Sequence, residues 1–176
     1  MQYVDKLLFA RDTDQITIDI LEAIRTNDVR AAYRILIIAD VSANMTYDDL
    51  SKDVHHVQPV TEKTLYDPTS CEITEDSGKP EGCLQGCSLL HLACQYGHPV
   101  MVELLLLFGA DINMQDFHGR TPLHRCVQNK NDALTKHLLK RGARTTIKDG
   151  GGLTALERRM ELGAITDEEL FILFVR

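Results

Sequence analysis

Apolar residues recur at helical spacing in short segments that glycine and proline interrupt. In the second half of the chain, Gly97 separates an apolar stretch over 89–96 from another over 99–107, and Pro99 stands where the second stretch begins. Proline suits the first turn of a helix, because its missing N–H is unpaired there in any case. The pattern predicts two short antiparallel helices, the second ending at Gly109 in the left-handed conformation.

This helix pair recurs with a fixed period of 33 residues. Leu90-His91 returns as Leu123-His124, and Gly119 returns as Gly152. A constant period of this length indicates a repeat architecture, in which each unit buries its apolar face against the next. Residues 116–119 read as the turn that joins one unit to the next.

A degenerate unit precedes the regular ones. Residues 20–27 and 31–36 alternate as the helix pair does, with Asn27 at the place of Gly97, but the offset to the next unit exceeds one period. The excess coincides with residues 45–86, which are acidic, contain proline and glycine, and lack helical periodicity. We expect this insertion to be a long surface loop or disordered.

The fold class predicted from these patterns is all-α, a solenoid of about four helix-turn-helix repeats. Near the C-terminus, Thr166 followed by Glu169 has the spacing of a capping box, so a last helix is expected to begin there. The predicted segments are 1–15 (a linker), 16–44 (the degenerate first repeat), 45–86 (the acidic flexible insertion), 87–119 and 120–152 (two regular repeats) and 153–176 (a C-terminal capping repeat).

The period and the hexapeptide Gly119-Arg120-Thr121-Pro122-Leu123-His124 resemble the ankyrin repeat. A second resemblance lies in the order of features. Tyr3-Val4-Asp5-Lys6 resembles the end of the Arf-GAP domain of plant ACAP-type Arf GTPase-activating proteins, and 20–28 and 86–91 resemble ankyrin helices of that family. The family joins a membrane-bending coiled coil, a PH domain, a zinc-containing Arf-GAP domain and ankyrin repeats. The resemblance implies that 1–15 includes the tail of an Arf-GAP-like domain.

The resemblance implies a non-catalytic protein–protein interaction module in vesicle trafficking, with partners in the Arf pathway. The Arf-GAP zinc finger needs four closely paired cysteines and a catalytic arginine, and nothing after the 3–6 match supplies them. We therefore expect no enzyme activity from the chain, and interpret it as a fragment, a truncated gene model or a remnant; Met1 favours truncation. Two alternatives stay open: direct regulation of Arf nucleotide hydrolysis, and a free-standing ankyrin adaptor or inhibitor unrelated to Arf.

Composition narrows the setting of this module. A formal net charge of −7 disfavours binding to nucleic acid. No uninterrupted apolar run reaches the roughly 20 residues needed to cross a bilayer, and the first residues lack a secretory signal. Five cysteines without disulfide spacing fit a reducing compartment. We expect a cytoplasmic protein, peripheral to endomembranes if it contacts them.

Charge is segregated along the chain, with acidic residues over 46–81 and basic residues over 120–159. One hypothesis is that the acidic insertion masks the basic repeats, which would contact anionic membranes weakly once unmasked. The alternative is that both segments are merely solvated. The basic residues expected to take part are Lys136, Lys140, Arg141, Arg144 and Lys148.

Cysteine and histidine cluster around the start of the second repeat, but their spacing does not fit a structural zinc site. The residues are Cys83, Cys87, His91 and Cys94. We interpret Cys94 and Cys126 as core thiols, and His91 and His124 as framework residues that hydrogen-bond the backbone of the adjoining loop. No metal and no cofactor are expected.

The predicted partner contacts lie on the repeat tips and on the concave face formed by the first helices. Phe117 is the notable residue, because a turn between repeats is normally polar. Either its ring folds back onto Met114 or His118, or it anchors a partner. The residues assigned to partner binding are Met114, Gln115, Phe117 and His118 on the tip, and Tyr96, Arg125, Gln128 and Asn129 on first helices.

Overall fold

A computed structural model describes residues 13–38, 41–47, 86–163, 165 and 167–175 of the chain. In these ranges the regular elements are all α-helices, which confirms the predicted all-α fold of stacked helix pairs. The helices are α2 (Thr13–Arg25), α3 (Val29–Ile38), α5 (Leu89–Tyr96), α6 (Pro99–Leu107), α7 (Pro122–Gln128), α8 (Asp132–Lys140), α9 (Ala155–Glu161) and α10 (Glu168–Val175).

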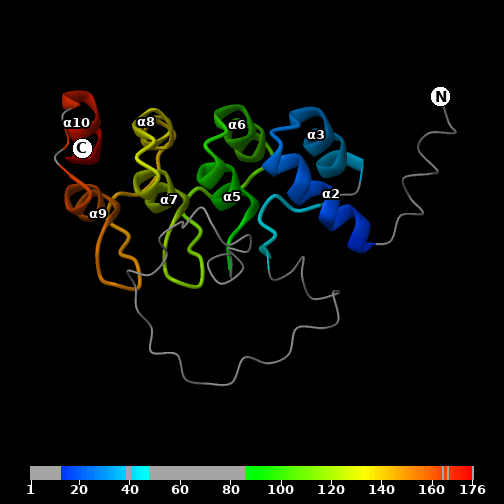
Figure 1. Cartoon of the computed structure of the whole chain (residues 1–176), viewed down its shortest axis with the longest axis horizontal. Coiled ribbons are helices and arrows are strands. Elements are labelled where there is room, and N and C mark those ends of the chain that lie inside the picture. The colour runs from blue at the N-terminus through cyan, green and yellow to red at the C-terminus, as the bar shows by residue number, and fades with distance from the viewer. Residues whose placement is uncertain (1–12, 39–40, 48–85, 164, 166, 176) are drawn as a thin grey trace, which may run out of the picture.

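The helices form two rows, and tips project from one side of the stack (Figure 1). One row holds the first helix of each pair (α2, α5, α7, α9). The other row holds the second helix of each pair (α3, α6, α8, α10), and we call these the outer helices and their row the outer row. One continuous apolar core runs between the rows, with Ile20, Leu90, Leu105 and Leu123 fully buried within it. Each helix pair therefore completes its core against its neighbours.

Helix α2 begins at Thr13, three residues before the start of the predicted first repeat at residue 16. The last helix spans Glu168–Val175. The backbone N–H of Leu170 donates to the Asp167 carboxylate at 3.1 Å, which places an aspartate cap at this helix start. Thr166, which was expected to form the cap, lies outside the described residues.

A capping box begins the first helix of each later repeat. Ser88 with His91, Thr121 with His124 and Thr154 with Glu157 each satisfy backbone N–H groups reciprocally. Gly97 ends α5 at φ +74°, a left-handed conformation that glycine adopts without strain.

The two histidines also join neighbouring repeats. Nδ1 of His91 accepts from the Ser88 backbone N–H at 3.1 Å, so Nε2 carries the proton and donates to the Arg120 carbonyl at 2.9 Å. His124 bonds the Leu153 carbonyl at 3.3 Å. These contacts confirm the predicted bonds to the adjoining loops. Burial lowers the pKa of His91 to about 4 and also lowers the pKa of His124, so both rings are neutral near pH 7.

The acidic insertion joins the fold at a tip. The Tyr47 backbone N–H donates to the Cys87 carbonyl at 2.7 Å. Equivalent bonds close the two later tips: the Asp116 N–H donates to the Arg120 carbonyl, and the Asp149 N–H donates to the Leu153 carbonyl, each at 2.8 Å. The flanking bridge between Thr46 and Ser88 matches the bridge between Lys148 and Thr154. Residues 48–85, which make up most of the predicted insertion, lie outside the described residues.

Candidate protein-binding surface

A buried aspartate organises the tip between the second and third repeats. The Asp116 carboxylate accepts from the backbone N–H groups of His118 at 2.9 Å and Arg120 at 2.8 Å, which fixes the turn. Its other oxygen accepts from Arg125 of α7 at 2.6 Å, and the side chains are 0% and 6% exposed. Charge-assisted bonds of this kind are short and strong, so the tip is tied rigidly to the helix behind it.

The same device recurs one period later. Asp149 accepts from the backbone N–H groups of Gly151 and Leu153, and from Nε of Arg158 at 2.7 Å. Burial by itself raises the pKa of Asp149, but the bonds from Arg158 and the backbone hold that pKa below its usual range. Sequence reasoning missed both Asp–Arg pairs. The signal was present, since each partner recurs at the period of 33 residues.

Neighbouring tips are also bonded to each other. Gly150 N–H donates to the His118 carbonyl at 2.7 Å, and the Gln115 amide donates to the Lys148 carbonyl at 3.2 Å. A Cβ at Gly86 would lie 2.6 Å from the Phe117 nitrogen, so the tips also touch closely there. Within the described residues, neighbouring tips therefore contact each other and are not independent loops.

Phe117 stands out from this edge. Its side chain is 77% exposed, and its ring meets the His118 ring edge-on with 6.2 Å between centroids. Of the two interpretations left open, contact with His118 is therefore present, but it covers little of the ring. Met114 is half-buried and Gln115 is exposed. The tip thus offers one large apolar group on a rigid support.

The first-helix residues separate into surface and core. Tyr96 is 42% exposed and stacks on His98, and exposed Asn129 donates to the Gln95 carbonyl at 2.6 Å. Gln128 is half-buried and accepts from Arg120 at 3.4 Å. Arg125 is a correction to the expected surface, because it is buried and bonded to Asp116. Its position on the helix is the expected one, but the aspartate on the tip draws its guanidinium inward.

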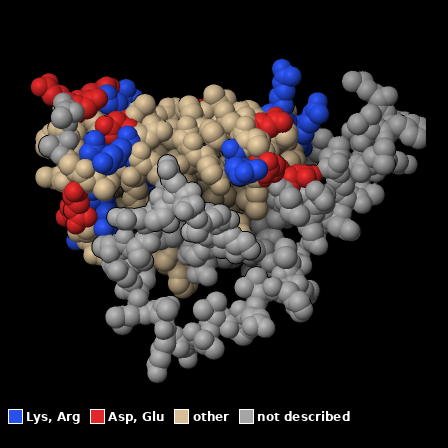
Figure 2. All heavy atoms as spheres, viewed as in Figure 1, with Lys and Arg blue, Asp and Glu red and all other residues tan. Residues whose placement is uncertain are grey.

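Ion pairs cross between the outer helices and neutralise much of the basic region. Lys136 and Lys140 of α8 bond Glu169 of α10 at 2.9 and 2.7 Å, and Arg141 pairs with Glu103 of α6. Figure 2 shows red and blue side chains side by side over the end of the stack that carries α10. Three of the five cations in the masking hypothesis thus have carboxylate partners within the repeats.

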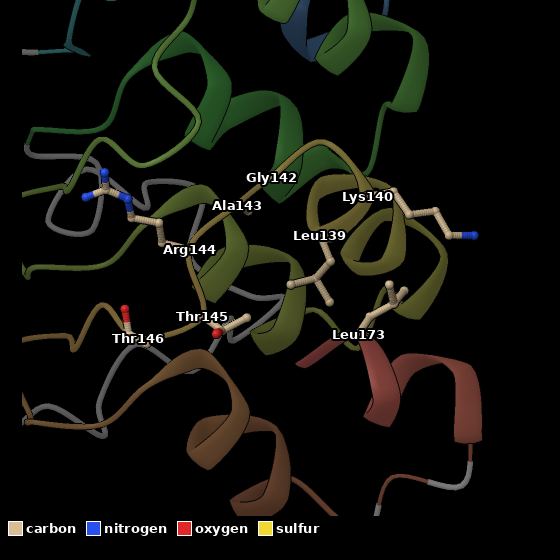
Figure 3. Close-up of a pocket in the computed structure, with 8 residues that line it drawn as sticks. All are labelled: Leu139, Lys140, Gly142, Ala143, Arg144, Thr145, Thr146 and Leu173. Atoms are coloured by element: carbon tan, nitrogen blue, oxygen red, sulfur yellow. The ribbon is translucent and has the colours of Figure 1, made fainter. Parts of the chain in front are cut away.

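The other two, Arg144 and Lys148, are exposed and form no ion pair within the described part of the chain. Arg144 borders a hollow of about 550 Å³ between the end of α8, the loop after it and α10. Leu139 and Leu173 point into this hollow, whereas the charged ends of Lys140 and Arg144 point away (Figure 3). The hollow therefore lacks the converging charges of an anion site.

Cys87, Cys94 and His91 are engaged by the protein itself, whereas Cys83 lies outside the described residues. Cys87 accepts from Arg125 at 3.2 Å, and both ring nitrogens of His91 are hydrogen-bonded. Burial raises the pKa of the Cys87 thiol to about 11, and raises that of Cys94 as well. Cys87, Cys94 and Cys126 are free thiols in the core, as expected for the last two. Among the described residues no group of metal-ligating side chains comes together.

Comparison with known proteins agrees with this architecture. A model of ankyrin repeats in three copies matches residues 61–149, so the chain belongs to the ankyrin-repeat family. It is 50% identical to the ADP-ribosylation factor GTPase-activating protein AGD2 and 46% identical to AGD4, both of Arabidopsis thaliana, over 98% of its own length. It spans 24% of each of those proteins. Mouse Rabankyrin-5 is 35% identical over a match that covers 46% of this chain and 7% of Rabankyrin-5.

The chain is thus an ankyrin-repeat interaction module that resembles part of plant Arf GTPase-activating proteins, as the sequence resemblance indicated. In the segments that the structure describes, no helix combines the length and the apolar composition that crossing a bilayer requires.

Proposed function

We propose that this chain binds a protein partner of an Arf-regulatory complex through its tips and adjoining first helices. The proposed surface comprises Met114, Gln115, Phe117 and His118, with Tyr96, Gln128 and Asn129 beside them. Arg125 is omitted because it is buried. The kind of complex is inferred from AGD2 and AGD4, whose names describe them as GTPase-activating proteins of ADP-ribosylation factor.

The observation that carries the proposal is the exposure of Phe117 on a tip that buried bonds hold rigid. An exposed aromatic on an ordered support loses little entropy when it binds, which is the property of an interface hot spot. The second tip has the same framework but carries Gly150 and Gly151 in place of large side chains.

Leu107 supplies a matched control for a test of this surface. Its side chain is 76% exposed, but it lies on α6, in the outer row. The immobilised wild-type chain, Phe117→Ser and Leu107→Ser are compared for the proteins they retain from an Arabidopsis extract. At least one protein should be lost by Phe117→Ser and kept by Leu107→Ser. Identical protein sets for all three would exclude the tip as the binding surface.

We further propose that the chain does not accelerate GTP hydrolysis by itself. Arg125 and Arg158 serve the framework, since each bonds a buried aspartate of a tip. A single-turnover assay with GTP-loaded ADP-ribosylation factor should give the same rate with and without the chain. Clear acceleration would instead favour the alternative of direct regulation.

A further inference from the structure

Two cations lie beside the tip that carries Phe117, on the neighbouring segment of the third repeat. The Arg144 backbone N–H donates to the Asn113 side-chain oxygen at 2.8 Å, and the Gln115 amide donates to the Lys148 carbonyl at 3.2 Å. Both cationic side chains are exposed, and that of Arg144 points away from the hollow it borders (Figure 3). The exposed ring and the two cations are therefore held next to one another by bonds of the backbone framework.

The charges of Arg144 and Lys148 are left over after the framework has formed its own ion pairs. Arg158 and Arg159 of α9 pair with carboxylates, as Lys136, Lys140 and Arg141 do. Arg144 and Lys148 have no such partner among the described residues. The unneutralised positive charge of this region thus lies beside the tips, and not on the outer helices.

Glu157 is the described carboxylate whose charge reaches Lys148. Its oxygen accepts from both the backbone N–H and the hydroxyl of Thr154, at 2.7 and 2.8 Å. These bonds lower the pKa of Glu157, and the charge of Lys148 adds a smaller effect in the same direction. Glu157 is therefore held in the capping box of α9, where it moderates the charge of Lys148 without pairing with it.

The two cations also do not recur at the repeat period. One period earlier, Asp111 stands at the place of Arg144 and Gln115 at the place of Lys148. Asp111 is exposed and accepts from the Asn113 N–H at 2.9 Å. Stacking of the repeats requires no positive charge at either position, since the preceding repeat is built without one. The cations are free to serve recognition, as the ring of Phe117 is.

We propose that the partner segment that covers Phe117 is acidic, with an apolar side chain against the ring and carboxylates against Arg144 and Lys148. The proposal rests on the proposed function of the tip surface and specifies the chemistry of its partner. Complementary charges beside an apolar contact fix the register of a bound segment and exclude basic competitors.

A short protein segment fits these cations better than a membrane does. Screening limits charge interactions to about 8 Å at physiological salt, so a segment lying on the tips responds to the cations next to it rather than to the net charge of −7. An anionic bilayer is an extended sheet of charge, which would also bring its charge toward the exposed carboxylates of Asp111 and Glu157. A segment can place its own carboxylates only where a cation meets them.

A display library of short random peptides, selected on the immobilised full chain and counter-selected on Phe117→Ser, tests the chemistry of the partner. Peptides that need Phe117 should be enriched in aspartate and glutamate and should carry an apolar residue. Peptides that need Phe117 without this acidic enrichment would overturn the proposal and leave the tip surface in place. If no selected peptide needs Phe117, this proposal and the tip surface both fail.

Isothermal titration of one selected peptide then tests the two cations. The double variant Arg144→Gln with Lys148→Gln should bind about fivefold more weakly at low salt, and high salt should narrow the difference because exposed ion pairs are screened. Arg30→Gln with Arg34→Gln is the matched control. Both of these arginines are exposed on α3, in the outer row, and form no ion pair in the part of the chain that the structure describes.

The control removes the same amount of charge and should bind the peptide as the wild type does. All four replaced side chains are exposed, so both double variants should keep their helical circular dichroism. Equal affinities of the two double variants would overturn the proposal, because total charge and not the position of the cations would then govern binding.

Co-sedimentation with vesicles of phosphatidylserine and phosphatidylcholine in equal parts separates a membrane from a protein segment. The wild type and the Arg144→Gln, Lys148→Gln variant should sediment alike with these vesicles. Vesicle binding that the wild type shows and this variant loses would assign the cations to lipid headgroups and overturn the proposal.

Discussion

The two tips that the structure describes in full share a framework and differ in what they display. In each, an aspartate receives backbone N–H groups of the turn and an arginine from the following helix. One tip then presents Phe117 to solvent, and the other presents glycine. Side chains that recur at the repeat period build the stack. Those that do not recur are the ones available for recognition, and the two sets can be altered separately.

The largest expected difference between the tips concerns their aspartates. Asp116→Ala leaves the Arg125 guanidinium buried without its closest carboxylate partner, which should lower the free energy of unfolding by about 3–5 kcal/mol. Asp149→Ala should cost less, about 1–2 kcal/mol, because the Arg158 side chain is 20% exposed and regains water. Urea denaturation of both variants measures the difference. Equal losses would show that the two pairs do not differ in burial as described.

Acid should weaken the histidine links between repeats. Burial lowers the pKa of His91 to about 4, so below pH 6.5 the unfolded chain binds a proton that the folded chain refuses. Stability is therefore complete above pH 6.5 and is lost as pH falls toward 4, by about 2 kcal/mol between pH 7 and pH 5 for this residue. His124 adds a loss of the same sign.

Urea denaturation at pH 7 and pH 5 compares the wild type with His91→Gln, which should lose most of the pH dependence in this interval. The bonds from Arg141 and from Lys140 and Lys136 lower the pKa values of Glu103 and Glu169, so these carboxylates act mainly at lower pH. An unchanged slope in the variant would remove His91 as the cause.

A smaller contrast separates a glycine of the tip from one at a helix end. Gly119 and Gly109 both have positive φ, at +71° and +82°. A Cβ at Gly119 would lie 2.9 Å from the Gly150 nitrogen, whereas a Cβ at Gly109 meets nothing within 4 Å. Gly109→Ala should cost about 1 kcal/mol and Gly119→Ala about 2–3 kcal/mol. Thermal unfolding of the two variants measures both costs, and a ratio near one would mean that the tips do not pack closely.

Much of the framework could be predicted because it recurs. The period, the short helices around Gly97 and the loop bonds of His91 and His124 all follow from local signals repeated at one spacing. The Asp–Arg pairs recur too. Recognising them requires knowing that the side chain of a tip aspartate points back into its own turn, where it meets an arginine of the following helix. That is why Arg125 was expected on the surface.

Other features lie outside any local signal. The offset to the first repeat predicted an insertion, but only the structure shows that the residues flanking it, Tyr47 and Cys87, are bonded as in a tip. The pairs of Lys136 and Lys140 with Glu169 join different repeats, at distances that depend on how the outer helices stack. Counting charges along the sequence therefore overestimated how many basic side chains are free of carboxylate partners.

The most direct test of the account is the affinity of the chain for a protein identified through the Phe117→Ser comparison and then purified. Isothermal titration compares the wild type, Phe117→Ser and Leu107→Ser, alongside their free energies of unfolding. Phe117→Ser should bind at least tenfold more weakly, a loss of about 1.4 kcal/mol, while its free energy of unfolding changes by less than about 0.5 kcal/mol. Leu107→Ser should match the wild type in affinity. Equal affinities for all three chains would contradict the claim that the tip is the binding surface.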